Sequence, residues 1–204
     1  DYPLTNMEYL DTKGFIDSIN HIKPKLVIIS NPNNPTGTMI PYEDILEITN
    51  RLDGMMVLDE AYIDFSSISP KDDTREVKNL IVLRTFSKAM SLAGIRLGYM
   101  IANEEVIEYI NRVRSPYNVN SLTQEIALKA LESKGLFLEN IENIKIERER
   151  MKIELEKKGF SPLSSQGNFL FFQARKGFGR KLQEKGILIR GYSKDLEGYF
   201  RLTI

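Results

Sequence analysis

Three short apolar runs constrain the fold of this chain most strongly. Residues 26–29, 55–58 and 80–83 contain only apolar side chains, and helix-length segments separate them. A strand with apolar residues in every position is buried on both faces, which is typical of a parallel sheet covered by helices. Gly98–Ala102 predicts a fourth strand. The chain is therefore expected to form an α/β fold with a largely parallel sheet.

Apolar periodicity predicts helices between and after these strands. Two helices are expected in the first half of the chain, at Thr12–Ile22 and Tyr42–Arg51, and the lone histidine, His21, lies at the end of the first. Three more are expected at residues 104–113, 122–131 and 137–158. The charged residues of the last helix are expected to form a solvated face opposite an apolar stripe.

The C-terminal segment predicts a second, smaller α/β unit. Strands are expected at residues 168–172, 187–189 and 199–204, with a helix around 180–184. The pattern changes near residues 115–116. We therefore expect a large domain over residues 1–115 and a small domain over 116–204 that includes the long connecting helix.

Composition narrows the class of function. The 28 basic residues balance 28 acidic ones, so the chain lacks the positive footprint of a protein that binds nucleic acid or an anionic membrane. It has no cysteine and one histidine, which excludes disulfides and argues against thiolate or histidine-rich metal sites. No apolar run reaches the roughly 20 residues of a membrane span, and no signal peptide is evident. We expect a cytoplasmic enzyme that acts on small molecules.

A lysine follows the third strand, in the segment RTFSK at residues 84–88. The amine of Lys88 can form a Schiff base with an aldehyde if its pKa is lowered. Thr85, Ser87 and Arg96 offer two hydroxyls and a guanidinium, which suit a phosphate dianion. A single Ser-Lys pair is more often a helix cap and a solvated lysine. Taken together, however, these residues predict a pyridoxal phosphate site.

Polar residues also follow the first two strands. A pyridine ring that serves as an electron sink needs a carboxylate beside its nitrogen, and Asp59 is placed for that role. Asn34 and Tyr62 can donate hydrogen bonds to a phenolate oxygen. Taken singly, Asp59 could be a helix cap, Asn34 a turn former and Tyr62 a packed aromatic residue.

These motifs carry a family resemblance. NNPTG (33–37), DEAY (59–62) and TFSK (85–88), followed by Arg96, resemble in their order the signature of fold-type I, class I/II pyridoxal-phosphate aminotransferases. The segments at 59–65, 91–96 and 115–120 most resemble the histidinol-phosphate aminotransferase branch. The resemblance runs over essentially the whole chain.

The resemblance implies a role for each residue. Lys88 would form the Schiff base, and Asp59 would pair with the pyridine nitrogen. Asn34 and Tyr62 would contact the phenolate oxygen, while the cofactor phosphate would bind Thr85, Ser87 and Arg96.

The resemblance also implies a substrate site. Arg201 and Arg190 would hold the phosphate of the amino substrate or a carboxylate of 2-oxoglutarate, with Asn168 nearby. An arginine in an apolar strand is costly without a partner, which favours a binding role for Arg201. The family further implies a homodimer.

Residues 1–30 depart from the family pattern. They lack the phosphate-cradling loop, the aromatic residue that stacks on the cofactor and the substrate-gating arm. We therefore expect a fragment without the N-terminal part, with an open sheet edge and an uncovered apolar face. The segment alone is expected to bind the cofactor weakly and to have poor activity.

Other functions fit parts of the same pattern. A phosphothreonine decarboxylase or another amino-acid aminotransferase of this fold would share the cofactor residues. A non-catalytic ligand-binding or regulatory module could keep the fold alone. A serine hydrolase that uses Ser87 with Lys88 is disfavoured, because adjacent residues on a strand point to opposite faces.

Overall fold

The first half of the chain forms a four-stranded sheet with helices on one side. The computed structural model describes residues 2–4, 7–66 and 76–204. The strands are β1 (Leu26–Ser30), β2 (Met55–Asp59), β3 (Leu80–Thr85) and β4 (Gly98–Ala102), in the order β1-β2-β3-β4. The first three are parallel, and β4 runs antiparallel to β3. All four predicted strands are present.

The direction of β4 follows from its connection to β3. Residues 86–97 contain only the short 3-10 turn η3 (Ala93–Ile95) and no crossover helix. A connection without a helix can join antiparallel strands, whereas parallel strands are usually joined by a crossover that contains an α-helix. The chain therefore returns directly alongside β3.

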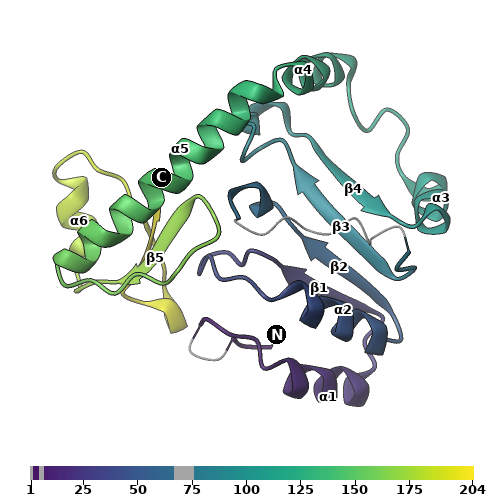
Figure 1. Ribbon diagram of the computed structural model, residues 1–204, viewed down its shortest axis with the longest axis horizontal. Helices are drawn as coiled ribbons and strands as arrows, with labels where there is room; N and C mark the ends of the chain where they lie inside the picture. Colours follow the sequence, from purple (N-terminus) through teal and green to yellow (C-terminus); the bar gives the residue numbers. More distant parts are fainter. Residues whose placement is uncertain (1, 5–6, 67–75) are drawn as a thin grey trace.

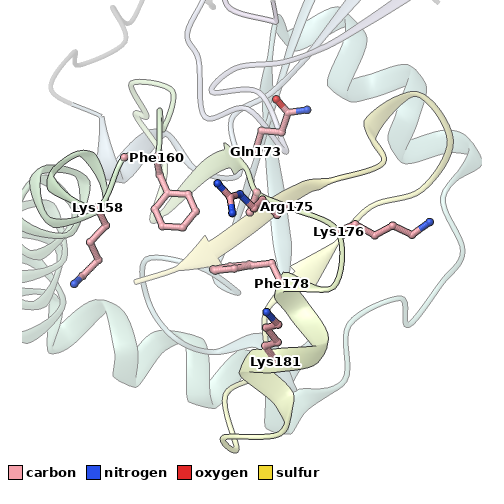
Figure 2. Close-up of a pocket in the computed structure, with 9 residues that line it drawn as sticks. Lys158, Phe160, Gln173, Arg175, Lys176, Phe178 and Lys181 are labelled. Atoms are coloured by element: carbon pink, nitrogen blue, oxygen red, sulfur yellow. The ribbon is translucent and has the colours of Figure 1, made fainter.

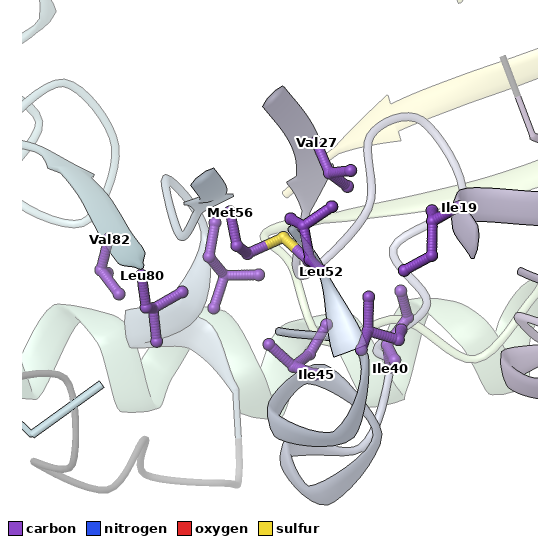
Figure 3. Packing of buried hydrophobic residues seen from close by; sticks show 10 residues of the cluster. Ile19, Val27, Ile40, Ile45, Leu52, Met56, Leu80 and Val82 are labelled. Carbon is purple, nitrogen blue, oxygen red and sulfur yellow. The ribbon is translucent and has the colours of Figure 1, made fainter. Parts of the chain in front are cut away.

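One face of this sheet is packed and the other is open. Helices α1 (Thr12–Ile22) and α2 (Tyr42–Arg51) supply Ile19, Ile45 and Ile48 to a core that includes Met56 and Leu80 (Figure 3). On the opposite face of β1, Ile28 is 67% exposed. The expectation of an uncovered apolar face is confirmed, whereas the expectation that the strands are buried on both faces is wrong for β1.

Three helices lead to the second sheet. They are α3 (Glu104–Val113), α4 (Ser121–Glu132) and the long α5 (Lys134–Lys157), which runs from α4 to the neighbourhood of β5 (Figure 1). Asn103 and Asn120 cap α3 and α4 by accepting hydrogen bonds from the backbone. None of the helices described is long and apolar enough to cross a membrane.

The second sheet is antiparallel and is assembled in the order β5-β7-β6. Its elements are β5 (Phe169–Gln173), α6 (Phe178–Gln183), β6 (Arg190–Gly191), η4 (Lys194–Leu196) and β7 (Tyr199–Thr203). The strand predicted at residues 187–189 is wrong. The Ile187 N–H bonds to the Leu182 carbonyl and closes the turn after α6, so pairing begins only at Arg190.

The prediction for α5 needs one correction. Its solvated face carries ion pairs such as Arg150 with Glu147 and Lys157 with Glu154. Arg148, however, is only 6% exposed and lies in line with the buried Ile141 and Leu155. One charged residue therefore occupies the apolar stripe.

Candidate active site

The site begins where the parallel strands end. In the register of the sheet, Ser30 lies opposite Asp59 and Asp59 lies opposite Leu83, so the carboxyl ends of β1, β2 and β3 meet at one edge. This edge is where ligands bind in such sheets. Asp59 is half-buried, and its Oδ1 accepts a hydrogen bond from the Ala61 N–H at 3.0 Å. The bond fixes the carboxylate at the strand end.

Lys88 and Tyr62 lie next to each other at this edge. Strand β3 ends at Thr85, so Lys88 lies in the following turn. Its Nζ is 5.3 Å from the centroid of the Tyr62 ring. Among the described residues, Lys88 forms no ion pair with a carboxylate. The amine is thus held beside a phenol without an acidic partner.

The turn after β3 presents the predicted phosphate donors. The Thr85 hydroxyl accepts from the Ser87 N–H at 3.0 Å and donates to the Leu97 carbonyl at 3.3 Å. The Phe86 N–H also bonds to the Leu97 carbonyl, which returns the neighbouring Arg96 to the end of β3. Arg96 is exposed and has a left-handed backbone. The turn therefore combines hydroxyls and a guanidinium.

The second sheet brings two arginines, Arg201 and Arg190, close to the loop that carries Asn34. Arg201 Nη1 donates to Asn34 Oδ1 at 2.8 Å, across 167 residues of chain. Arg190 lies directly opposite Arg201 on the neighbouring strand. Like charges in this position repel each other, and Arg201 Nε is buried with no hydrogen-bond partner in the described structure. An anion held by the two guanidinium groups would relieve both costs.

Asn168 lies just before this sheet. It is half-buried, and its carbonyl accepts from the Ile204 N–H at 2.9 Å, which ties the start of β5 to the end of β7. Its side chain makes none of the hydrogen bonds described. Asn168 is therefore near Arg201 along the sheet, and a direct role in binding stays a prediction.

Phe169 was not predicted as a site residue. Its ring contacts the Tyr62 ring edge-on, with centroids 5.0 Å apart, and the Arg201 guanidinium lies 5.2 Å from its centroid. Phe169 thus joins the lysine side of the site to the arginine side. Its position in a continuous apolar run made it look like any other core residue.

A buried ion pair supports the strand ends. Glu60 is 2% exposed, and its Oε2 accepts from Arg84 Nε at 3.0 Å and Nη2 at 2.9 Å. Burial raises the pKa of Glu60 although Arg84 opposes it, and burial also raises the pKa of Asp64. The Glu60 carboxylate in turn raises the pKa of Arg84. The pair links β2 to β3 beside Asp59.

The donor set fits pyridoxal phosphate. Lys88 offers an amine, Asp59 a fixed carboxylate, and Ser87 and Arg96 donors for a phosphate. The Asn34 amide keeps its nitrogen for a ligand, because its bond to Arg201 uses only the oxygen. A phenol lies beside the amine. These are the groups that an aldehyde-bearing pyridine phosphate requires.

A cavity elsewhere in the molecule has a described lining that contains none of these residues. It has a volume of about 650 Å³ and lies between the end of α5 and α6, next to Lys158, Phe160 and Phe178 (Figure 2). Its described lining includes lysines and an arginine but no carboxylate. It offers no group for a ring nitrogen, so it is not the candidate active site.

Comparisons with known proteins show which family the chain belongs to. The family model for aminotransferase class I and II matches residues 2–204. The histidinol-phosphate aminotransferase of Thermoanaerobacter pseudethanolicus is 46% identical over 199 residues, which cover 95% of this chain and 56% of that protein. The chain therefore spans little more than half the length of this relative.

Two solved structures are similar in fold. That of histidinol-phosphate aminotransferase from Sinorhizobium meliloti, in complex with pyridoxal-5'-phosphate, has a TM-score of 0.87 and 26% identity; the match covers 98% of this chain and 58% of that one. L-threonine-O-3-phosphate decarboxylase from Porphyromonas gingivalis has a TM-score of 0.77 and 27% identity, covering 88% of this chain and 59% of that one. From the match over nearly all of its length, the chain belongs to the class I and II aminotransferase family.

Proposed function

We propose that the protein containing this chain is a pyridoxal-phosphate-dependent histidinol-phosphate aminotransferase. It would convert L-histidinol phosphate and 2-oxoglutarate into imidazole acetol phosphate and L-glutamate. The observation that carries the proposal is the series of contacts that runs from Lys88 through Tyr62 and Phe169 to Arg201. The amine of Lys88 and the guanidinium of Arg201 therefore lie at one connected site. The identity to enzymes of this name supports the choice of substrate.

The cofactor residues have separate tasks. When bound, pyridoxal phosphate supplies an aldehyde that condenses with amines and a ring that delocalises the electron pair left on the substrate carbon. Asp59 keeps the ring nitrogen protonated, while Asn34 and Tyr62 donate to the ring oxygen. Ser87 and Arg96 hold the phosphate. Thr85 shapes their turn, and its hydroxyl would become a third donor by turning its hydrogen from the Leu97 carbonyl to the phosphate.

Lys88 has two tasks in turn. Its amine would hold the cofactor through the aldehyde. Once that amine is free, it would act as the general base that removes the proton from the substrate Cα. The Tyr62 ring beside Nζ limits where that amine can move.

The arginine pair selects the substrate. A phosphate dianion or a carboxylate can accept charge-assisted hydrogen bonds from both Arg201 and Arg190, with Asn168 at the edge of the same site. Arg201 is already oriented by its bond to Asn34. The distance from Lys88 to this pair would therefore set which amines react.

We also propose how the protein is organised. The chain would divide near residue 115 into the end of a large domain and a small domain that begins at 116, and the enzyme would act as a homodimer in the cytoplasm. An open apolar face on the sheet, marked by Ile28, supports packing against further protein.

A decarboxylase is the second candidate. The threonine-phosphate decarboxylase from Porphyromonas gingivalis has the same fold and a name that implies a phosphorylated amino substrate. An arginine pair would suit either substrate. The two functions differ in their products, because a decarboxylase releases carbon dioxide and forms no glutamate.

A substrate panel on the full-length protein tests the proposal. Phosphorylated amino alcohols and amino acids are each supplied with 2-oxoglutarate, and glutamate and carbon dioxide are measured. We expect glutamate, formed fastest from L-histidinol phosphate. Carbon dioxide without glutamate would show that the protein is a decarboxylase. A faster reaction with an unphosphorylated amino acid would contradict L-histidinol phosphate as the substrate.

A further inference from the structure

Arg148 is a buried cation that the proposed reaction does not use. It lies midway along α5 and is 6% exposed. Its Nη1 donates to the Phe65 carbonyl at 3.1 Å and to the Gly167 carbonyl at 2.8 Å. Its Nε donates to Glu149, a mostly exposed neighbour, at 3.0 Å. One guanidinium nitrogen therefore joins two segments that are far apart in sequence.

The two carbonyls belong to opposite sides of the site. Phe65 ends η1 (Ile63–Phe65), which begins directly after Tyr62. Gly167 lies two residues before Phe169, whose ring lies between Tyr62 and Arg201. Arg148 thus holds the backbone that carries the lysine-side phenol against the backbone that leads to the arginine pair.

A second contact joins the same loop to the first sheet. The Gln166 N–H donates to the Gly37 carbonyl at 2.7 Å. Gly37 has a φ of +78°, and a Cβ there would lie 2.1 Å from Ser165 Oγ, so only glycine fits. The segment at 165–167 therefore contacts the loop that carries Asn34 directly and is linked to the turn after Tyr62 through Arg148.

Stability alone is a weak reason for a buried arginine at this position. Burying a guanidinium costs desolvation, and apolar residues of similar volume often replace buried charges without loss of stability. The neighbours on the same stripe, Ile141 and Leu155, are apolar. What an apolar side chain cannot do is hold two carbonyls at a fixed separation.

We propose that Arg148 is a positioning residue that sets the separation between the Lys88–Tyr62 side of the site and the Arg190–Arg201 pair. It thereby determines the preference for a phosphorylated amine over the same amine without phosphate. This inference rests on the proposed function. Arg148 touches neither the substrate nor the cofactor in this scheme and acts through Phe65 and Gly167.

The test compares variants of the full-length enzyme on L-histidinol phosphate and on L-histidinol. In R148M, the ratio of kcat/KM for the two substrates is expected to fall by about tenfold or more, because a shift of about 1 Å in a binding group can cost up to 10²-fold. The fall comes from a higher KM for the phosphorylated amine, with cofactor absorbance and the rate on L-histidinol within about threefold of wild type.

Two further variants complete the test. R150M removes an exposed arginine two residues away that pairs with Glu147, and its ratio is expected to match that of wild type. R148K keeps the charge and three donors, but on a shorter, more flexible side chain without the planar guanidinium, so its ratio is expected to lie between those of wild type and R148M. If R148M does not fold, a lowered ratio in R148K supports the inference.

An unchanged ratio in R148M, or in R148K when R148M does not fold, overturns the inference. So does an equal loss on both substrates, which is the result of a purely structural role. If the wild-type enzyme does not transaminate L-histidinol phosphate, the proposed function itself has failed and the inference fails with it. The two failures are therefore distinguishable.

Discussion

Two sides of the site are held by different kinds of contact: the cofactor side, which includes Lys88, Asp59 and Arg96, and the anion side, which is the Arg190–Arg201 pair. On the cofactor side, Asp59 bonds to Ala61, and Arg96 bonds to Ala93, so each residue is fixed by its own turn. On the anion side, Arg201 bonds to Asn34 across 167 residues. Arg148 likewise spans 83 residues to Phe65.

This difference predicts separate effects on the rate of the reaction and on the choice of substrate. A side that is built from local turns can keep its shape when one residue changes, so variants there should alter the reaction rather than the fold. A side that depends on contacts between the two sheets should respond through substrate binding. The following predictions test that separation in the full-length protein, in order of decreasing effect.

Replacement of Lys88 should have the largest effect. K88A removes the amine that we propose anchors the cofactor and moves the Cα proton, so multiple turnover should fall by about 10⁴-fold or more. Glutamate formation over many enzyme equivalents is the measurement. K158A, which changes a lysine of the distant cavity, is the control and should retain wild-type rates. Sustained turnover by K88A would contradict the role of Lys88.

Replacement of Asp59 should reduce the rate while the fold persists. In D59N the amide oxygen can still accept from the Ala61 N–H, but the charge beside the ring nitrogen is lost. We expect kcat to fall by about 10²- to 10³-fold, the range for loss of one preorganised electrostatic group. The thermal midpoint should stay close to that of wild type. A full rate in D59N would show that this carboxylate does not serve the ring.

Replacement of Arg201 should raise KM more than replacement of Arg190. R201M loses the anion contact and the bond to Asn34, so KM for the phosphorylated substrate should rise by about 100-fold, whereas R190M should raise it by about tenfold. Cofactor absorbance should not change in R190M. Equal KM values for both variants, or loss of the cofactor signal in R190M alone, would contradict this difference between the two arginines.

Parts of this arrangement could be read from the sequence and parts could not. The residues at strand ends form contiguous motifs, and the runs around them predicted four strands correctly. The sequence did not predict the direction of β4, which depends on a turn without a helix. It also did not predict that β6 begins at Arg190, which follows because Ile187 closes the turn after α6.

The residues that join the two sides were missed for a physical reason. Phe169 and Arg148 act through partners that lie far away in the chain, and neither has a local motif. Arg148 did carry one signal, since it occupies the register of the apolar stripe between Ile141 and Leu155. A charged residue in that register indicates a buried partner.

The smallest effect concerns pH and the Glu60–Arg84 pair. Because burial raises the pKa of Glu60 above its usual 4.5, its contribution to stability is complete below pH 4.5 and declines as pH rises through the raised value. In E60Q this decline is absent, while Asp64 titrates in both proteins. The free energy of unfolding should therefore fall less between pH 4.5 and 7 in E60Q than in wild type. Denaturant titrations at pH 4.5 and pH 7 measure the free energy of unfolding of both proteins. An equal fall in wild type and E60Q would contradict the raised pKa of Glu60.

The most direct test of the site is chemical capture of its amine. The full-length protein is saturated with pyridoxal phosphate and reduced with borohydride, and its peptides are then analysed by mass spectrometry. We expect that the yellow absorbance is lost and that the phosphopyridoxyl group is found on the peptide that contains Lys88. A modified peptide that contains a different lysine, or no modified peptide at all, would contradict the proposed role of Lys88.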